Sequence, residues 1–215
     1  MKLKKFFIIM FFSLFLIGCT MVEDMSYQDI INIFNNVPKK ANASRRGYKY
    51  YLPNGMESIN RGDYYEVLKS KKSYYYLYVD MISYINKLEN QYEIDNKANY
   101  SDLIKIGDKY GYLEINLLEN EKYLIEIMYN YAKIEVMVNE DSINEALCYS
   151  VNILNSIEYN NSVINSLLSD DTLNYTEEEF NLFETGVDNS NKLEYIEQIE
   201  EIEEDNTLTD TDYVS

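Results

Sequence analysis

The sequence predicts an α+β fold: an antiparallel β-meander sheet covered by a C-terminal amphipathic helix, with an N-terminal helix and an acidic disordered tail. Three observations lead to this prediction. Apolar and polar residues alternate in successive short segments between residues 101 and 139, as in antiparallel strands joined by tight turns. A helical apolar stripe follows over residues 142–157, and a shorter one precedes over residues 27–34. Residues 186–215 are acidic, with too few apolar residues to pack.

The composition narrows the possible chemistry. The chain has 215 residues, of which 46% are hydrophobic, enough for the core of one domain. It has no histidine, which removes the commonest general base and the commonest zinc ligand. Its seven glycines form no phosphate-binding loop, and no spacing of acidic residues favours a metal site. We therefore expect neither a cofactor nor a metal.

The charge is distributed unevenly along the chain. The net charge is −18, which argues against a nucleic acid partner. Residues 39–72 nevertheless hold nine lysines and arginines against three acids, whereas residues 170–215 hold one lysine against sixteen acids. The basic segment could meet anionic lipid or wall polymer, could be a solvated loop, or could be an internal partner for the acidic tail.

The first residues have the layout of a secretory signal peptide. Lys2, Lys4 and Lys5 precede an apolar run over residues 6–16 that only Ser13 interrupts. A membrane-spanning helix needs roughly 20 apolar residues. The apolar stretch that ends at residue 17 supplies only twelve, so a cleaved signal is the preferred interpretation.

The end of this run, Leu16-Ile17-Gly18-Cys19, resembles the lipobox of bacterial lipoproteins. The resemblance implies that residues 1–18 are removed and that Cys19 becomes the lipidated first residue, carrying palmitate-type chains. The protein would then be a lipoprotein held at the cell membrane on its extracytoplasmic side. Residues 19–25 would be a tether, residues 26–185 the α+β domain and residues 186–215 the tail.

The domain begins with a predicted helix. Ser26 is a suitable N-cap residue, and Pro38 ends the helical segment because the residue before proline avoids the helical region. Strands are then expected over residues 48–52, 64–68 and 74–80, with a turn at residues 53–55 and a loop over residues 89–100. Residues 81–88 fit either a strand or a helix, and the sequence does not decide between them.

The predicted covering helix follows the meander, whose strands are expected over residues 103–106, 110–118, 123–128 and 131–138. Ser142 and Glu145 have the spacing of a capping box. Cys148 lies off the apolar stripe, and we interpret it as a small residue on the helix flank rather than a nucleophile, because no histidine exists to activate it. Further short helices are predicted over residues 163–168 and from residue 176.

One segment resembles a known fold family. Residues 48–56, Tyr-Lys-Tyr-Tyr-Leu-Pro-Asn-Gly-Met, are similar to the first strand and turn of PsbP-like domains, although Met56 stands where those domains usually have an aromatic residue. The resemblance extends in outline over residues 48–157. It implies a non-catalytic accessory or binding module, and it assigns no functional residue.

Two groups of residues are candidates for a partner surface. Tyr74, Tyr76 and Tyr78 fall on one face of the predicted strand, where aromatic side chains either stack against a sugar or peptide or simply finish the sheet. Arg45 and Arg46 lie in the basic segment near the predicted anchor.

These observations favour a non-catalytic binding or accessory module that contacts another envelope protein or a wall polymer. The alternative is an extracytoplasmic hydrolase that works without histidine, through Asp and Glu carboxylates alone. A purely structural, surface-coating lipoprotein is a third hypothesis. Converging carboxylates in a deep pocket would favour the hydrolase, and a shallow surface would favour binding.

Overall fold

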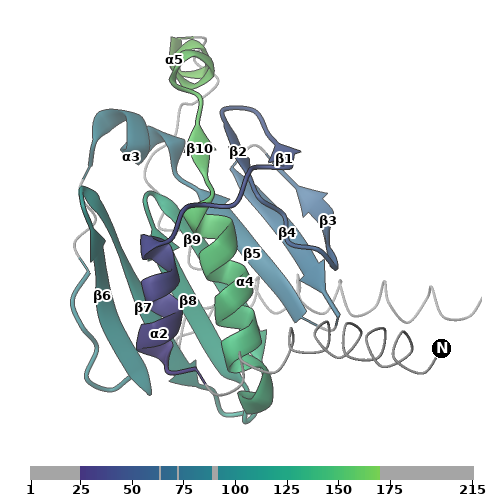
Figure 1. Cartoon of the computed structure of the whole chain (residues 1–215), viewed down its shortest axis with the longest axis vertical. Helices are drawn as coiled ribbons and strands as arrows, with labels where there is room; N and C mark the ends of the chain where they lie inside the picture. Colours follow the sequence, from purple (N-terminus) through teal and green to yellow (C-terminus); the bar gives the residue numbers. More distant parts are fainter. Residues whose placement is uncertain (1–24, 63, 72, 89–91, 170–215) are drawn as a thin grey trace, which may run out of the picture. The chain divides into compact units, whose positions relative to one another are not determined.

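The structure is a computed structural model, in which residues 25–62, 64–71, 73–88 and 92–169 are described. The predicted α+β class with a large antiparallel sheet is confirmed (Figure 1). The predicted signal peptide, the lipobox, the helix from residue 176 and the acidic tail lie outside the described residues. None of the helices in the described ranges is long and apolar enough to cross a membrane.

The main sheet has seven strands, and every neighbouring pair is antiparallel. It combines two meanders, β3 to β5 and β6 to β9, which join where β5 pairs with β9 (Figure 1). The meander predicted between residues 101 and 139 is the second of these. The strands, in the order in which they lie in the sheet, are β3 (Met56–Arg61), β4 (Tyr65–Ser70), β5 (Ser73–Val79), β9 (Ala132–Val138), β8 (Tyr123–Tyr129), β7 (Lys109–Leu117) and β6 (Tyr100–Ile106).

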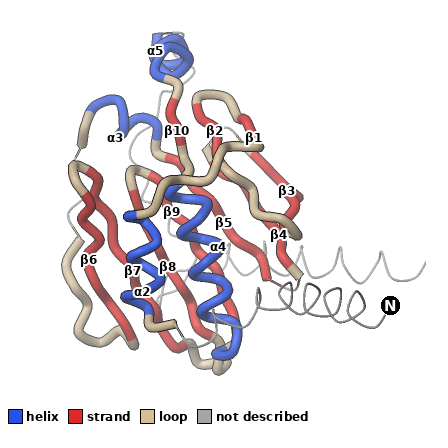
Figure 2. The backbone as a smooth tube through the Cα atoms, viewed as in Figure 1, coloured by secondary structure: helices blue, strands red, loops and turns tan. Residues whose placement is uncertain are grey.

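Two helices lie on one face of this sheet (Figure 2). Helix α4 (Ile143–Asn155) corresponds to the predicted stripe and buries Leu147 and Val151 in the core. Helix α2 (Tyr27–Ile31) packs beside α4 and continues as a short 3₁₀ turn, η1 (Asn32–Asn35). We call the sheet face under these helices the inner face and the opposite one the outer face.

The two predicted helix caps have different outcomes. The Ser26 hydroxyl accepts a hydrogen bond from the backbone N–H of Asp29 at 3.2 Å, as predicted for the start of α2. The capping box at Ser142 is wrong, because a 3₁₀ turn, η2 (Glu140–Ser142), already leads into α4 and Ser142 has helical backbone angles. Glu145 instead accepts a hydrogen bond from Lys71 at 2.8 Å.

The undecided segment from residue 81 forms helix α3 (Met81–Asn86). The Asp80 carboxylate accepts a hydrogen bond from the Ser83 N–H at 2.8 Å, and Lys87 ends the helix in the left-handed region at φ 56°. Three short strands form a second sheet at the same end of the domain, with helix α5 after the last of them. These elements are β1 (Ala43–Ser44), β2 (Tyr48–Tyr50), β10 (Glu158–Tyr159) and α5 (Asn161–Ser169).

Candidate functional site

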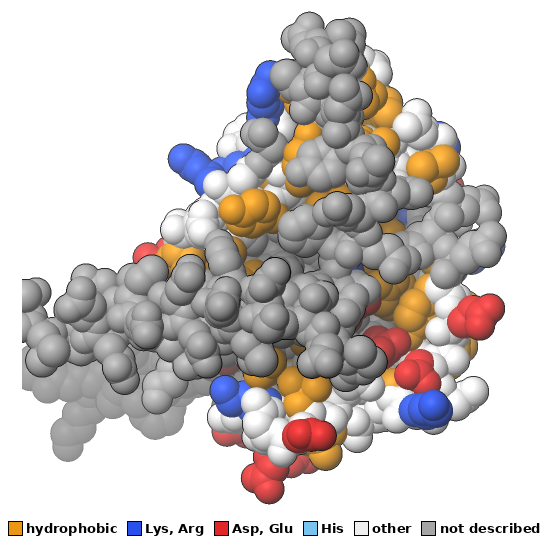
Figure 3. Space-filling model, turned by 180° about the vertical axis from the view of Figure 1, so that it is seen from behind, with side chains coloured by type: hydrophobic (Ala, Val, Ile, Leu, Met, Phe, Trp, Pro, Cys, Tyr) orange, Lys and Arg blue, Asp and Glu red, His pale blue; other side chains and the backbone are white. Residues whose placement is uncertain are grey.

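The outer face of the main sheet gathers the polar and aromatic side chains that alternate with the core. The strand register determines its members, because cross-strand partners point to the same side of a sheet. Figure 3, viewed from the side opposite the view of Figure 1, shows hydrophobic side chains among the described residues that are visible on that side. Across the sheet, the central rows of the outer face are made by Tyr65, Val67, Lys69, Tyr74, Tyr76, Tyr78, Lys133, Glu135, Met137, Leu124, Glu126, Met128, Tyr112, Glu114 and Asn116.

Three glutamates form a row across adjacent strands of this face. Glu135 of β9 lies opposite Glu126 of β8, which in turn lies opposite Glu114 of β7. Lys133 supplies a cation beside the first two: its Nζ is 2.7 Å from Glu135 and 3.6 Å from Glu126. Glu135 is only 1% exposed, so its carboxyl group is almost completely removed from water.

Tyrosine hydroxyls bind the other two carboxylates of the row. Tyr112 donates a hydrogen bond to Glu126, and Tyr92 donates one to Glu114. The two tyrosine rings stack with their centroids 3.9 Å apart and 1° between their planes. The segment before β6 therefore holds Tyr92 against the outer face, where it completes a carboxylate–tyrosine cluster.

The electrostatics of the cluster follow from burial and from neighbouring charge. Burial raises the pKa of Glu135, and the adjacent Glu126 raises it further, while Lys133 opposes both. Burial and the neighbouring carboxylates also raise the pKa of Tyr92 and Tyr112, so both hydroxyls remain hydrogen-bond donors at neutral pH. Glu126 and Glu135 are cross-strand partners, so their side chains lie on the same face of neighbouring strands.

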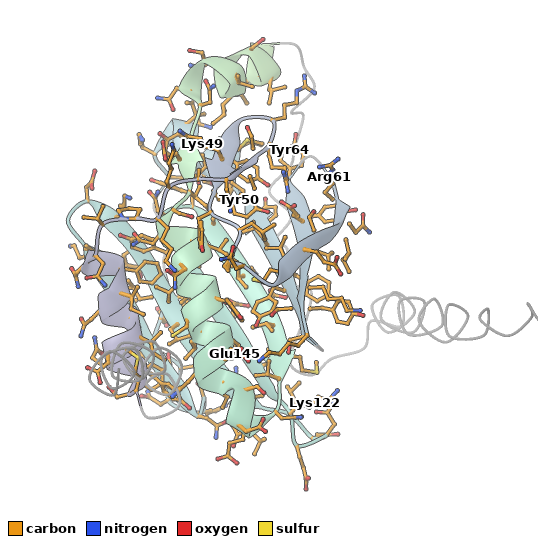
Figure 4. All side chains as sticks on the ribbon, turned by 45° about the vertical axis from the view of Figure 1, so that its right-hand side comes forward. Lys49, Tyr50, Arg61, Tyr64, Lys122 and Glu145 are labelled. Carbon is orange, nitrogen blue, oxygen red and sulfur yellow. The ribbon has the colours of Figure 1, made fainter. Side chains whose placement is uncertain are left out.

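Replacing Lys133 with Met is expected to destabilise the domain by about 2 kcal/mol at pH 8, because two carboxyl groups lose their cation. The loss should shrink toward pH 5. Without Lys133 the folded-state pKa of Glu135 should be higher. The folded domain then loses stability as the pH rises through that pKa, because the buried carboxyl group ionises there. Urea unfolding at both pH values measures this. Lys122→Met, at an exposed turn (Figure 4), is the control, and an equal loss in both variants would contradict the role of Lys133.

The predicted tyrosine surface lies on the outer face beside this cluster. Tyr76 is the cross-strand partner of Glu135, and Tyr78 is the partner of Lys133. Tyr74 lies two residues further along β5, with the Nζ of Lys69 4.9 Å from its ring centroid. All three side chains are half-buried. The strand thus presents them as a row, in agreement with the alternation in the sequence.

Arg45 lies elsewhere, on the side of the sheet that carries the helices. Its Nε donates to the Glu66 carboxylate at 2.8 Å, and its Nη2 donates to the second carboxylate oxygen. Glu66 is fully buried and pairs across the strands with Leu77, a core residue. Arg45 also lies over the ring of Tyr50 at 5.5 Å, whereas Arg46 is exposed. The two arginines and the three tyrosines do not form one continuous surface.

Three carboxylates in these arrangements, Glu66, Glu126 and Glu135, were not predicted as site residues from the sequence. Glu66 occupies an inward position of β4, and an acid at an apolar position of a strand is the signal that could have indicated a buried ion pair. Alternation places Glu126 and Glu135 on the polar sides of their strands. Their position opposite one another depends on the register between β8 and β9, which the sequence pattern does not determine.

Two other features of the domain are a cleft beside α2 and the thiol of Cys148. A cleft of about 740 Å³ lies at the start of α2, between Tyr27, Tyr100 and the turn at Glu140. Cys148 is half-buried, and burial raises the pKa of its thiol, which is opposite to the activation of a nucleophile.

In the part of the chain that the structure describes, no three acidic, cysteine or histidine side chains converge as metal ligands would. Comparison with protein-family models, curated proteins and solved structures gave no match.

The buried tyrosines predict a sharp loss of stability in alkali. Burial raises the pKa of each hydroxyl, so above pH 10 the unfolded chain releases protons that the folded domain retains. Stability should then fall by about 1.4 kcal/mol per pH unit for each such tyrosine. The check is unfolding followed by circular dichroism against pH. Tyr75→Phe should raise the pH at which half of the protein is unfolded. An unchanged pH midpoint would contradict the assignment of alkaline unfolding to tyrosine ionisation. The tyrosines concerned are Tyr48, Tyr50, Tyr75, Tyr112 and Tyr159.

Proposed function

We propose that this protein is a lipid-anchored binding module on the extracytoplasmic side of the cell membrane, without chemistry of its own. The observation that carries the proposal is the position of Cys19. The lipobox-like sequence ends seven residues before Ser26, the residue that caps the first helix of the domain. A lipidated cysteine, a short polar tether and a folded domain would thus follow one another directly.

The tether limits where the domain works. Six residues, 20–25, extend over at most about 21 Å. An acylated Cys19 would therefore keep the domain beside the bilayer surface, where its partner is another envelope protein or an anionic wall polymer. The row of half-buried tyrosines at positions 74, 76 and 78 is the recognition surface that we propose, because tyrosine presents an apolar ring together with a polar hydroxyl.

The interactions of the described carboxylates support binding rather than catalysis. Glu66 is held by Arg45, Glu126 by Lys133 and Tyr112, and Glu114 by Tyr92. A general acid or base must reach the proton that it transfers. These carboxylates instead accept hydrogen bonds from neighbouring side chains, which is the arrangement expected of structural polar clusters.

The hydrolase remains the second candidate, and one observation favours it. Glu126 and Glu135 are cross-strand partners on one face of the sheet, and burial together with Glu126 raises the pKa of Glu135, as in carboxyl pairs that share a proton. Purified protein should be assayed on wall polysaccharide and on peptides, with Glu126→Gln as the control. Hydrolysis by the wild type that this variant loses would establish the enzyme. Equal, background rates in both proteins would favour the binding module.

Replacing Cys19 with Ser tests the anchor. The variant is expected to stay uncleaved or to leave the membrane fraction, because it cannot accept the acyl chains that provide about 0.8 kcal/mol for each buried methylene. The measurement is fractionation of cells followed by immunoblotting. Cys148→Ser is the matched control and should remain with the membrane. A Cys19→Ser protein that is cleaved after residue 18 and still fractionates with the membrane would contradict the proposed anchor.

A further inference from the structure

We propose that the cleft at the start of α2 is a binding site for a small organic ammonium ion, a molecule that joins a positive charge to an apolar body. The cleft has a volume of about 740 Å³. It is separate from the tyrosine row at positions 74, 76 and 78. The proposal goes beyond the proposed function and does not depend on the lipid anchor, because the residues that carry it belong to the folded domain.

Four elements of the domain meet around this cleft. Tyr27 belongs to α2, Tyr100 is the first residue of β6, and Glu140 begins the turn η2 that leads into α4. Helices α2 and α4 lie side by side (Figure 1). The side-chain amide of Asn144 in α4 donates a hydrogen bond to the backbone carbonyl of Met25 at 2.9 Å. Tertiary contacts therefore hold the walls of the cleft in place.

Two tyrosine rings form the aromatic side of the cleft. The ring centroids of Tyr27 and Tyr100 are 5.1 Å apart, and the ring planes meet at 75°, which makes a T-shaped pair. Both side chains are half-buried, so they offer apolar contact without being closed off from solvent. An aromatic ring attracts a cation that lies over its face within about 6 Å of its centroid. Met25 and Ile143 add apolar surface.

The charged side of the cleft is negative. Glu140 and Asp141 line it and are exposed, whereas no lysine or arginine is among the described residues that line it. Burial raises the pKa of the Tyr27 hydroxyl, and Tyr123 and Glu140 raise it further, so the charge of Glu140 acts at the tyrosine side of the cleft. None of the ion pairs among the described side chains includes Glu140. Its carboxylate is thus open to a cationic ligand.

Other classes of ligand fit this lining less well. Glu140 and Asp141 would repel a phosphate or a carboxylate, and a neutral sugar would not use their charge. A phospholipid headgroup such as phosphocholine carries a phosphate beside its ammonium group, so the same repulsion applies. A calcium ion needs about six to eight oxygen ligands, and no three acidic side chains converge among the described residues. An ammonium ion with methyl or methylene groups matches the rings and the carboxylates together.

Titration with choline, followed by NMR of the ligand, tests the site. The full chain is purified from membranes in detergent. The control ligand is 3,3-dimethylbutan-1-ol, which has nearly the shape of choline without its charge. We expect saturable choline binding that is about fivefold or more tighter than binding of the alcohol. Phosphocholine should bind more weakly than choline. The proposal is overturned if choline does not saturate, if the alcohol binds equally well, or if phosphocholine binds more tightly, as a lipid-headgroup site would require.

Variants of two lining residues test whether choline binds in this cleft. Glu140→Gln should weaken choline binding about threefold or more. Glu57→Gln, an exposed acid on β3, is the matched control and should bind like the wild type. Tyr27→Leu should weaken binding about fivefold, whereas Tyr27→Phe keeps the ring and should retain it. Glu140 is exposed, so its variant decides the result even if Tyr27→Leu fails to fold. Equal affinities of the Glu140 and Glu57 variants would overturn the proposal.

Discussion

Replacing Arg45 with Leu is expected to destabilise the domain by about 3–5 kcal/mol. The substitution leaves the fully buried carboxylate of Glu66 without the guanidinium that donates two hydrogen bonds to it. It also removes the cation over the ring of Tyr50. Arg45 lies in the turn after β1 and contacts Glu66 of β4. Its loss should therefore also destabilise the sheet formed by β1, β2 and β10. Urea unfolding of the full chain measures the difference.

An exposed ion pair of the same small sheet provides the matched control. Lys49 of β2 contacts Glu158 of β10 at 2.8 Å, and both side chains are more than half exposed (Figure 4). Lys49→Leu should therefore change stability by less than about 1 kcal/mol. The double variant Arg45→Leu with Glu66→Leu should recover much of the loss, because no buried charge remains. Equal effects of the two single variants would contradict the importance of the buried pair.

Replacing Gly111 with Ala is expected to cost at least about 3 kcal/mol. Gly111 lies in β7 between Ile104 of β6 and Tyr129 of β8. An added Cβ would overlap the backbone carbonyl oxygen of Met128 and would lie 2.9 Å from the Cα of Tyr129. Backbone atoms cannot move aside as a flexible side chain can, so β7 would have to separate from β8.

Gly55→Ala distinguishes a steric clash from a general intolerance of alanine. Gly55 has φ +84° and nothing within 4 Å of an added Cβ, so its replacement should cost only about 1 kcal/mol of backbone strain. Thermal unfolding of both variants gives the comparison. If Gly111→Ala unfolds at the temperature of Gly55→Ala or above it, the close approach of β7 and β8 is not what limits this position.

The sequence predicts the strongly patterned elements of this fold. Strands β8 and β9 alternate apolar and polar residues, and the apolar stripe of α4 matches the core that the helix covers. The pairing of β5 with β9 could not be predicted, because alternation determines which face a side chain takes but not which strand lies beside it. Strand β3 was missed because it is a polar edge strand with an irregular register between Ser58 and Asn60.

The candidate site was predictable only in part, for the same reason. The row of Tyr74, Tyr76 and Tyr78 follows from alternation within one strand, and the structure has that row. The contacts of Lys133 with Glu126 and of Arg45 with Glu66 join residues of different elements. Such contacts depend on register and on the position of the small sheet, so local pattern does not reveal them.

The mass of the N-terminal peptide of the mature protein tests the central proposal most directly. Protein extracted from membranes should give a first peptide that begins at Cys19 and carries the added mass of a diacylglyceryl group, with no peptide from residues 1–18. A peptide that still joins Met1 to an unmodified Cys19 would contradict the anchor. It would also remove the reason to place the binding surface beside the membrane.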